Sequence, residues 1–374
     1  MHIVLAPDAY KGSLTALEVA ETMKKAITDS NTNHHVIMKP MADGGEGTVD
    51  ALLLANQGKK TSISCTGPLG DTINTYYGVI DEKVAVMECA NLAGLMQVPY
   101  EQRNPDKTTT YGIGEAIKHA LDRGCTSFII GLGGSATNDG GLGMLLALGM
   151  QAWDRQGEPV GIFGRNLQHV HTICLQKMDP RLCNVNIKVA SDVDNPLCGE
   201  SGASNIYGPQ KGATSEQVKQ YDHSLRLFSD LIESKIGKKI RNLQGAGAAG
   251  GLGFALMAIG ATLVSGAKLV ADAMQMELAM KQADIVITGE GQSDEQTLYG
   301  KAPGYIAELA AKHNIPVLLI SGSLSGNLDL LNAHFAGCFS VIDKPMTLEV
   351  CMEQAEQLVY NQTKQLIHLL DATS

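Results

Sequence analysis

The sequence predicts an α/β fold in which a discontinuous, doubly wound parallel-sheet domain is interrupted by a second, mixed α/β domain. Short apolar runs alternate with helical patterns near both ends of the chain, as in the βα units of a parallel sheet. In the middle, strand-like runs lie close together and are joined by turn signals, as in antiparallel hairpins. A chain of 374 residues, 44% of them apolar, can fill two cores.

The first domain is expected to consist of residues 1–64 and 284–374. Its N-terminal part contains two βα units, with HIVLAP and HHVIMKP as strands and MADGGEG as the second loop. The first helix follows DAYKGSL and extends to about Asp29, and Thr15 and Glu18 have the spacing of a capping box. The second helix is TVDALLLAN. Near the C-terminus we expect strands at 284–290, 316–322 and 338–343, and helices around 304–312 and from Thr347.

The inserted domain is expected to cover residues 65–283. TSISCTGPLG, INTYYGVI and VAVMECAN predict hairpin strands at its start. A helix at 112–123, the strand SFIIGL and the loop GGSATNDGG with its own helix follow. The strand 186–191, the loop DVDNPL and a helix over 215–236 complete the pattern.

Composition argues against several classes of partner. The formal net charge of −10, the absence of a basic stripe and the few aromatic residues predict that the protein does not bind nucleic acid. The short apolar run before Pro7 predicts neither a signal peptide nor a membrane anchor, so we expect a cytoplasmic protein. Eight cysteines without a CxxC pair predict reduced, packed thiols.

The loops after the first two strands contain side chains that suit an anion or a metal. Doubly wound sheets bind ligands at the carboxyl ends of their strands. PDAYKGS offers Asp8 and Lys11 before a helix N-terminus, although turn and capping roles explain the same residues. MADGGEGT places Asp43 beside Gly44 and Gly45, whose backbone N–H groups could approach an oxygen anion.

The loop GLGGSATNDGG has two interpretations. Its glycines, hydroxyls and carboxylate suit phosphate, and its candidate ligand residues are Gly133, Gly134, Ser135, Asn138 and Asp139. It also satisfies the GxGxxA dinucleotide fingerprint, with Asp154 near the position expected for ribose binding. Asp154 lies in a polar turn rather than at a strand end, which makes a dehydrogenase the less favoured alternative.

Three further loops complete the parts that phosphoryl transfer needs. SDVDNP carries carboxylates for a metal or a base, GPQKGAT carries a lysine, and TGEGQSDEQTLYGK carries both kinds of charge. No GxxxxGK[ST] sequence occurs, so a P-loop kinase is excluded. The candidate residues in these loops are Asp192, Asp194, Asn195, Gln210, Lys211, Glu290, Asp294 and Lys301.

MADGGEGT, GGSATNDGG, DVDNPL, GPQKGAT, GAGAAGGLG and ITGEGQSDEQTLYGK, in this order, resemble the type I glycerate kinase family. The resemblance covers nearly the whole chain. It implies a flavodoxin-like domain interrupted by a second α/β domain, and ATP- and Mg²⁺-dependent phosphorylation of glycerate. It also favours D-glycerate and its O2 atom. Ala9, Tyr10, Ser191 and Gln292 depart from the family pattern, and Gln292 replaces a common arginine.

We expect an active site in the cleft between the two domains. Asp192 is the predicted base, and Lys11 and Lys211 are further catalytic candidates. Predicted ATP contacts are Gly44, Gly45, Gly133, Gly134, Ser135, Asn138, Asp139 and Lys301. Predicted substrate contacts are Asp8, Asn195, Gln210 and Asp294, and predicted metal ligands are Asp43, Asp194 and Glu290. The expected partners are glycerate and ATP, the oligomeric state is left open, and the alternatives are a dinucleotide-dependent hydroxy-acid dehydrogenase and a non-catalytic acid-binding sensor.

Overall fold

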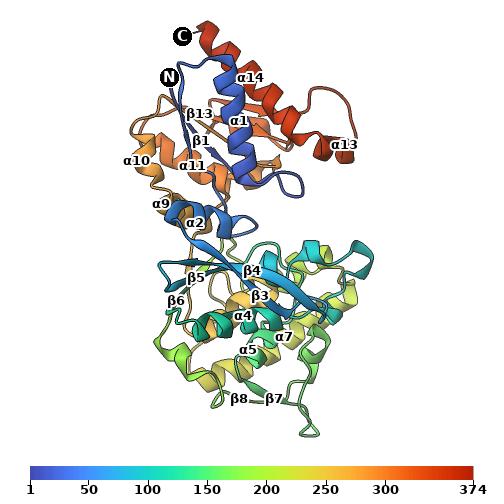
Figure 1. Cartoon of the computed structure of the whole chain (residues 1–374). Helices are drawn as coiled ribbons and strands as arrows, with labels where there is room; N and C mark the ends of the chain where they lie inside the picture. Colours follow the sequence, from blue (N-terminus) through green and yellow to red (C-terminus); the bar gives the residue numbers. More distant parts are fainter. Residues whose placement is uncertain (374) are drawn as a thin grey trace. The chain divides into compact units, whose positions relative to one another are not determined.

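The computed structural model describes residues 1–373, which fold into two compact units (Figure 1). Unit 1 contains Met1–Asp43, Asp50–Ala55 and the chain from Ser265 onward. Unit 2 contains Gly44–Val49 and Asn56–Val264. The chain therefore passes from one unit to the other between Asp43 and Gly44, within the loop MADGGEG.

Unit 1 is built on a five-stranded sheet in which every pair of neighbouring strands is parallel. The strands are β1 (His2–Pro7), β2 (His35–Met38), β11 (Ile285–Gly289), β13 (Val317–Ser321) and β15 (Gly337–Ser340). Their spatial order is β15-β13-β11-β1-β2. Numbered in chain order this is 2-1-3-4-5, the flavodoxin-like order, so the predicted fold class is confirmed.

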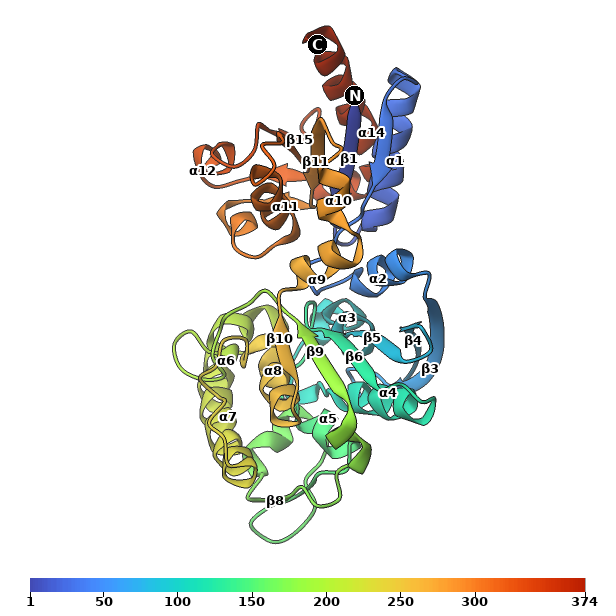
Figure 2. The same cartoon turned by 90° about the vertical axis from the view of Figure 1, so that its left-hand side faces the viewer.

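Helices cover both faces of this sheet (Figure 2). α1 (Ala16–Ser30) and α14 (Ala355–Thr373) pack side by side on one face, and α11 (Ala302–Ala311) packs on the other. The predicted capping box of α1 is present, because Glu18 N–H donates to Thr15 Oγ1 at 3.2 Å and Thr15 N–H donates to Glu18 Oε2 at 2.8 Å. The shorter elements are α2 (Thr48–Asn56), α9 (Gly266–Ala273), α10 (Met276–Met280), α12 (Leu328–Asn332), α13 (Leu348–Glu353), β12 (Gln292–Ser293) and β14 (Ser323–Leu324).

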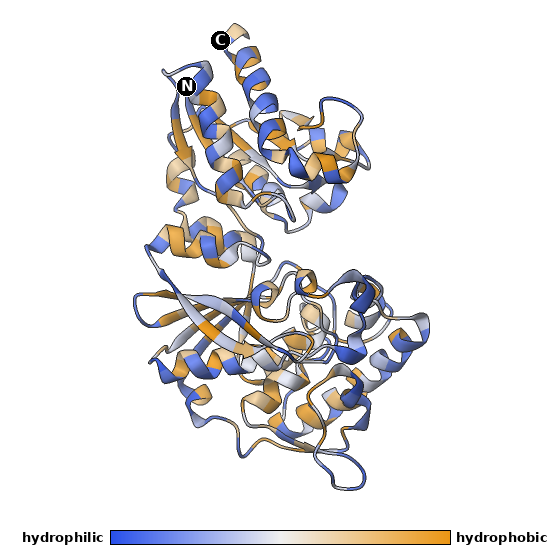
Figure 3. Ribbon diagram, turned by 45° about the vertical axis from the view of Figure 1, so that its right-hand side comes forward, coloured by the Kyte–Doolittle hydropathy of each residue, from blue (hydrophilic) through white to orange (hydrophobic). Residues whose placement is uncertain are grey.

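Amphipathic helices explain the core of unit 1. Figure 3 shows hydrophilic and hydrophobic residues alternating along the C-terminal helix α14. Leu358, Val359, Leu366 and Ile367 are its buried apolar residues. This recurrence at three to four residues gives one apolar stripe, which packs against the sheet. Burial of such stripes is the main favourable contribution to folding.

Unit 2 contains a six-stranded mixed sheet in the order β10-β9-β6-β5-β4-β3. Its strands are β3 (Lys59–Thr66), β4 (Thr72–Ile80), β5 (Val84–Glu88), β6 (Ser127–Gly131), β9 (Asn186–Ala190) and β10 (Thr262–Val264). The first three strands form the predicted antiparallel hairpins, and the remaining pairs are parallel. The carboxyl ends of β5, β6 and β9 therefore lie along one edge of the sheet.

The rest of unit 2 consists of helices and a small antiparallel ribbon. The α-helices are α3 (Cys89–Leu92), α4 (Tyr111–Asp122), α5 (Leu142–Ala147), α6 (Ala203–Tyr207), α7 (Ser215–Ile236) and α8 (Ala248–Ala258). The ribbon pairs β7 (Gln151–Trp153) with β8 (Thr172–Cys174). The 3₁₀ helices of the described chain are η1 (Leu95–Gln97), η2 (Tyr100–Gln102), η3 (Pro105–Lys107), η4 (Gly164–His169), η5 (Pro180–Asn184), η6 (Pro209–Lys211) and η7 (Glu295–Leu298).

The predicted domain bounds differ from these units in two places. β3 was assigned mainly to the first domain, but it pairs along its whole length with β4 and so belongs to unit 2. Residues 265–283 were assigned to the inserted domain, but they form α9 and α10, and α9 packs against α11 in unit 1. In both places the pairing partner is invisible to local sequence patterns. Among residues 1–373, no helix combines the length and apolar character needed to cross a membrane.

Candidate functional site

In unit 1, charged side chains gather where the parallel strands end. Asp8 and Lys11 follow β1, Asp43 follows β2, and Glu290 follows β11. Lys11 Nζ lies 3.8 Å from Asp43 Oδ2. Lys301 Nζ, at the start of α11, lies 3.1 Å from Glu290 Oε2. The sequence-based expectation that these strand ends carry the charged residues is therefore matched by their positions.

Asp8 is a buried carboxyl in a strongly electrostatic environment. Its Oδ1 accepts the N–H of Ala9 at 2.7 Å. Burial, and then the nearby Asp43 carboxylate, raise the pKa of Asp8 well above its ordinary value. The Lys11 ammonium lowers it in part, and Glu290 adds a smaller rise. A further positive charge here would therefore stabilise the ionised carboxylates.

Glu290 is fixed by three side chains. Its Oε1 accepts Ser293 Oγ–H at 3.1 Å and Thr297 Oγ1–H at 2.6 Å, while Oε2 accepts from Lys301. Ser293 Oγ also lies 2.7 Å from Ser321 Oγ, at the end of β13. The sequence analysis missed these hydroxyls, although Ser293 and Thr297 lie three and seven residues after Glu290 in the same charged segment.

Asp294 has a local capping role in this structure. Its Oδ1 accepts the N–H of Gln296 at 2.8 Å, and its own N–H donates to Thr297 Oγ1 at 3.1 Å. It is the N-cap of η7 and thereby orients the Thr297 hydroxyl toward Glu290. Its predicted contact with substrate stays a prediction.

A pocket of about 520 Å³ opens over this charged cluster. One end is polar and contains Asp8, Lys11, Glu290 and Lys301. The other end is apolar and is formed by Val341, Ile342, Leu348, Met352 and Ala355. Gln292, which replaces the arginine common in the resembling family, also lines the pocket.

In unit 2, three glycine-containing loops meet at the carboxyl ends of β6 and β9. Gly133 N–H donates to Gly44 O at 3.1 Å. A Cβ on Gly44 would lie 2.6 Å from Ala190 O, and one on Gly133 would lie 2.4 Å from Gly45 Cα. Glycine at these positions therefore permits backbone contact between segments that are far apart in the sequence.

Lys211 is buried beneath the loop GGSATNDGG and holds it in place. Its Nζ donates to Ser135 Oγ at 2.8 Å and to Thr137 O at 2.7 Å, and the residue is only 2% exposed. Burial lowers the pKa of Lys211 from its ordinary value to about 8, while Cys89 and Asp139 oppose this in part. The predicted catalytic lysine is thus, in this structure, a support of the loop.

Asp139 also supports the loop, because its carboxylate is fully engaged by neighbouring donors. Oδ2 accepts from Thr110 N–H, Thr110 Oγ1–H and Gly143 N–H, and Oδ1 accepts from Gly141 N–H. These bonds fix the start of α5 and link it to the start of α4. The structure therefore gives Asp139 a structural role, and its predicted ATP contact stays a prediction.

Two neighbouring polar atoms in this loop lack a hydrogen-bond partner. Thr137 Oγ1 and Asn138 Oδ1 are both buried and unpartnered. The amide nitrogen of Asn138 donates to Ser204 Oγ at 2.9 Å, so only its oxygen remains without a partner. Unpartnered buried polar atoms are rare in folded proteins, and they commonly mark a functional site.

The remaining predicted residues of unit 2 follow β9 or lie in η6. Asp192 is half-buried, and Asp194 and Gln210 are exposed. Asn195 is tied to its own loop, because Nδ2 donates to Ser201 O at 2.8 Å and Oδ1 accepts Tyr207 O–H at 2.5 Å. Of these residues, Asp192 lies nearest in sequence to Ala190, where the glycine-containing loops meet.

The run GAGAAGG packs against the same loops. Ala249, Gly250 and Gly251 have positive φ angles at the start of α8. A Cβ on Gly250 would lie 2.1 Å from Thr137 O, and Gly140 N–H donates to Gly250 O at 2.9 Å. This run therefore provides close backbone packing against residues 137–140.

The dinucleotide fingerprint lacks its structural context. Asp154 Oδ1 accepts the N–H groups of Gln156 and Glu158, both at 2.9 Å, in the turn after β7. β7 pairs with β8 in a separate ribbon rather than beside β6. In dinucleotide-binding folds the acidic residue belongs to the same parallel βαβ unit as the glycines. The geometry therefore does not support the dehydrogenase alternative.

No group of three or more His, Cys, Asp or Glu side chains in the described part of the chain is arranged to hold a metal ion. Asp43, Asp194 and Glu290 thus do not form a ready-made metal site. A Mg²⁺ ion bound with a nucleotide needs only one or two carboxylates, since phosphates and waters supply the other ligands. Asp8 and Asp43, whose mutual repulsion is recorded in the raised pKa of Asp8, are suited to such a site.

Comparisons with known proteins give a consistent result. The glycerate kinase family model matches residues 3–371. A glycerate kinase from Haemophilus influenzae is 46% identical over 99% of both chains, and a glycerate 2-kinase from Escherichia coli K12 is 43% identical over 93% of this chain and 92% of that protein. A solved structure from Salmonella typhimurium LT2, provisionally named glycerate kinase 2, has a TM-score of 0.84 at 43% identity and covers 100% and 99% of the two chains. These full-length matches show that the chain belongs to the glycerate kinase family and is an enzyme of that family.

Proposed function

We propose that this enzyme transfers the γ-phosphoryl group of ATP to O2 of D-glycerate in the presence of Mg²⁺, giving 2-phosphoglycerate and ADP. The observation that carries the proposal is the cluster of carboxylates and lysines at the strand ends of unit 1, in a chain of the glycerate kinase family. Lysines and metal-binding carboxylates are the groups that phosphoryl transfer uses. The relative named glycerate 2-kinase supports the choice of O2.

Asp8 and Asp43 are the carboxylates best suited to bind Mg²⁺ together with phosphate oxygens. Mg²⁺ held there would neutralise charge on the transferred group. Glu290 was also predicted as a ligand, but its two oxygens already accept from three side chains. Lys11, whose side chain is 59% exposed, is the lysine best placed to contact an anionic ligand. Lys301, paired with Glu290, is a second phosphate candidate.

Asp192 is the proposed base. Its carboxylate would accept the proton of the glycerate hydroxyl while the new O–P bond forms and the bond to the leaving ADP oxygen breaks. Support comes from its position just beyond β9, beside the glycine-containing loops that meet at Ala190. Asn195, Gln210 and Asp194 remain candidate substrate or metal contacts. The expected active-site cleft between domains and the cytoplasmic location stay predictions.

The test is ADP release from Mg·ATP with and without D-glycerate, combined with phosphorus NMR of the product. We expect glycerate-dependent ADP formation and the signal of 2-phosphoglycerate. A 3-phosphoglycerate signal would contradict the assignment to O2 alone. A folded enzyme that binds glycerate without releasing ADP would overturn the kinase proposal and favour an acid-binding sensor.

A further inference from the structure

The pocket of unit 1 is larger than a three-carbon acid requires. Its volume is about 520 Å³, and cavities of roughly 300–1,000 Å³ hold drug-sized ligands. Glycerate would occupy only a small part of this space. The pocket therefore fits the larger of the two proposed substrates.

The apolar end of the pocket exposes side chains that a folded protein normally covers. Ile342 is 39% exposed, Leu348 is 70% exposed and Met352 is 37% exposed. All three belong to the short segment 341–352 and line the same cavity. Exposed apolar residues grouped around a concave site favour a bound apolar group, whereas single exposed apolar residues need no explanation.

Gly12 makes room for this apolar wall. It has φ +82°, and a Cβ there would lie 2.8 Å from the terminal methyl of Met352. The loop after β1 therefore touches the apolar end through Gly12 and contributes Asp8 and Lys11 to the polar end. One loop contacts both parts of a ligand that would have an apolar and an anionic end.

The position in the sheet agrees with this polarity. The chain moves from β1 to β2 in one direction and then to β11, β13 and β15 in the other, so the order reverses between β1 and β11. The loops after β1, β11, β13 and β15 all line the pocket. Nucleotides bind outside the carboxyl ends of strands at such a switch point in open α/β sheets.

We propose that this pocket binds the nucleoside of the phosphoryl donor, with the purine against Val341, Ile342, Leu348 and Met352 and the phosphates toward Lys11 and Lys301. This inference rests on the proposed function, since it names the site of its nucleotide. It places the nucleoside in unit 1 rather than over the glycine-containing loops of unit 2. Electrostatic attraction between the lysines and phosphates sets the direction of the ligand.

Binding of ADP without glycerate tests the proposal apart from turnover. We would measure the Kd of Mg·ADP by calorimetry for the wild type, Leu348→Asp and Met352→Glu, with Leu369→Glu as the control. Leu369 is an exposed leucine on α14 that does not line the pocket. The loss of one buried apolar contact and its replacement by a charge near phosphate should weaken ADP binding about tenfold or more. The control should bind ADP as the wild type does.

Steady-state kinetics provide the second measurement. The two pocket variants should raise KM for ATP by a similar factor while KM for glycerate stays within about twofold. An unchanged Kd for ADP in both folded variants, or a rise in KM for glycerate alone, would overturn the proposal. If the wild type binds ADP with the expected variant effects but does not phosphorylate glycerate, the proposed acceptor fails and the nucleotide site stands.

Cys351 gives a direct probe of occupancy without substitution, because it lines the pocket and is half-buried. Mg·ADP should slow its alkylation by iodoacetamide, measured by peptide mass spectrometry. Alkylation of Cys183, an exposed thiol in unit 2, should not change. Protection of Cys351 by glycerate alone, or by raised protein concentration alone, would instead indicate an acid site or a contact between copies and would overturn the proposal.

Discussion

Asp192 is the residue on which the proposed chemistry depends most. Changing Asp192 to Asn removes the proton acceptor but keeps a similar shape, so kcat should fall about 10²- to 10⁴-fold. KM for ATP should change little. The measurement is glycerate-dependent ADP release at saturating ATP, with circular dichroism to verify folding.

Glu200→Gln is a matched control for this substitution, because Glu200 is an exposed carboxylate in the same loop region. It should retain nearly full turnover. If Asp192→Asn keeps kcat within about tenfold of the wild type, Asp192 is not the base.

Lys211 predicts a pH dependence. Its pKa of about 8 means that the ammonium loses its proton as pH rises through that value. The neutral amine would hold Ser135 and Thr137 O less strongly, so the loop should become less ordered. We expect kcat/KM to fall above about pH 8, measured from about pH 6.5 to 9.5. A profile that stays flat to the alkaline limit would contradict this role.

Gly44 and Gly47 form a natural pair for testing close backbone packing. Both have positive φ angles, +88° and +90°, but only Gly44 lies against other atoms, with Ala190 O at 2.6 Å from an added Cβ. Gly44→Ala combines backbone strain with a clash, whereas Gly47→Ala has strain alone. Thermal unfolding should show a clearly larger loss of Tm for Gly44→Ala. Equal losses would show that the contact with Ala190 is not tight in solution.

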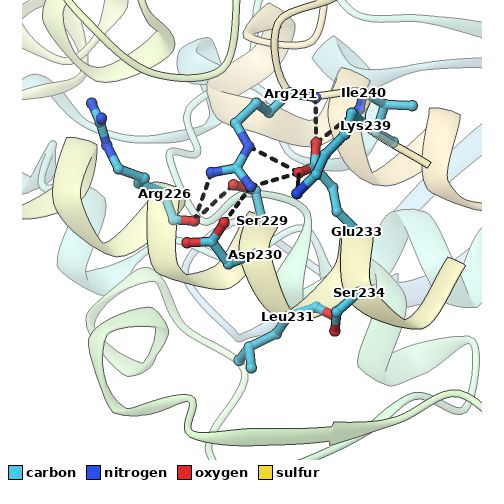
Figure 4. A network of polar contacts seen from close by, with 9 residues as sticks. All are labelled: Arg226, Ser229, Asp230, Leu231, Glu233, Ser234, Lys239, Ile240 and Arg241. Atoms are coloured by element: carbon cyan, nitrogen blue, oxygen red, sulfur yellow. Dashed lines mark hydrogen bonds and ion pairs between the residues drawn. The ribbon is translucent and has the colours of Figure 1, made fainter. Parts of the chain in front are cut away.

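At the scale of elements, the C-terminal end of α7 is held by an ionic network (Figure 4). Glu233 accepts from the N–H groups of Ile240 and Arg241, and its Oε2 accepts Arg241 Nε–H at 3.0 Å. Lys239 adds an ion pair at 3.3 Å. Burial would raise the pKa of Glu233, but these hydrogen bonds lower it to about 2.

This depressed pKa predicts acid sensitivity with a definite sign. A carboxylate with a lower pKa in the folded state stabilises the fold above its unfolded pKa, which is about 4.3, and that stability is lost as pH falls toward 2. Glu233→Gln should reduce the free energy of unfolding by about 3 kcal/mol at pH 7, because it leaves Arg241 without its buried partner. Urea denaturation at several pH values measures both effects.

The exposed Glu216, in the first turn of α7, is the control for this substitution. Glu216→Gln should change stability little. The Glu233→Gln variant should also lose stability less steeply than the wild type below about pH 4.3. An unchanged acid dependence would show that Glu233 does not carry the linkage.

The helices also differ in how well their sequences predicted them. α1 and α7 have capping boxes at Thr15 and Thr214, and these local patterns fixed both N-termini correctly. α8 begins with three positive φ angles at 249–251, which no local preference required of Ala249. Its conformation depends on packing against residues 137–140, so the run GAGAAGG could be noticed in the sequence but not interpreted.

At the scale of the whole molecule, all eight cysteines are free thiols. Cys65, Cys89 and Cys125 are buried, and burial raises the pKa of Cys89 to about 12. We therefore expect the same Tm with and without a reducing agent. Intact mass after alkylation in denaturant should show eight labelled thiols. Fewer labels under non-reducing conditions would reveal a disulfide and contradict the structure.

The sequence by itself determined the alternation of strands and helices, the five-stranded doubly wound sheet, the helix caps and the loops that carry charge. These features depend on local periodicity and on side chains a few residues apart. The motif order also identified the family, which the full-length matches confirmed. Asp8, Lys11, Asp43, Glu290 and Lys301 were all selected this way, and all belong to unit 1.

Only the tertiary structure decided which of the candidate groups are already engaged. Lys211, Asp139 and Asn195 have ligand-like chemistry in the sequence, but in the fold they support loops through hydrogen bonds to distant residues. The apolar end of the unit 1 pocket was likewise missed, because it combines residues 12 and 341–352. Such contacts join segments hundreds of residues apart, and they depend on packing geometry that local sequence patterns do not encode.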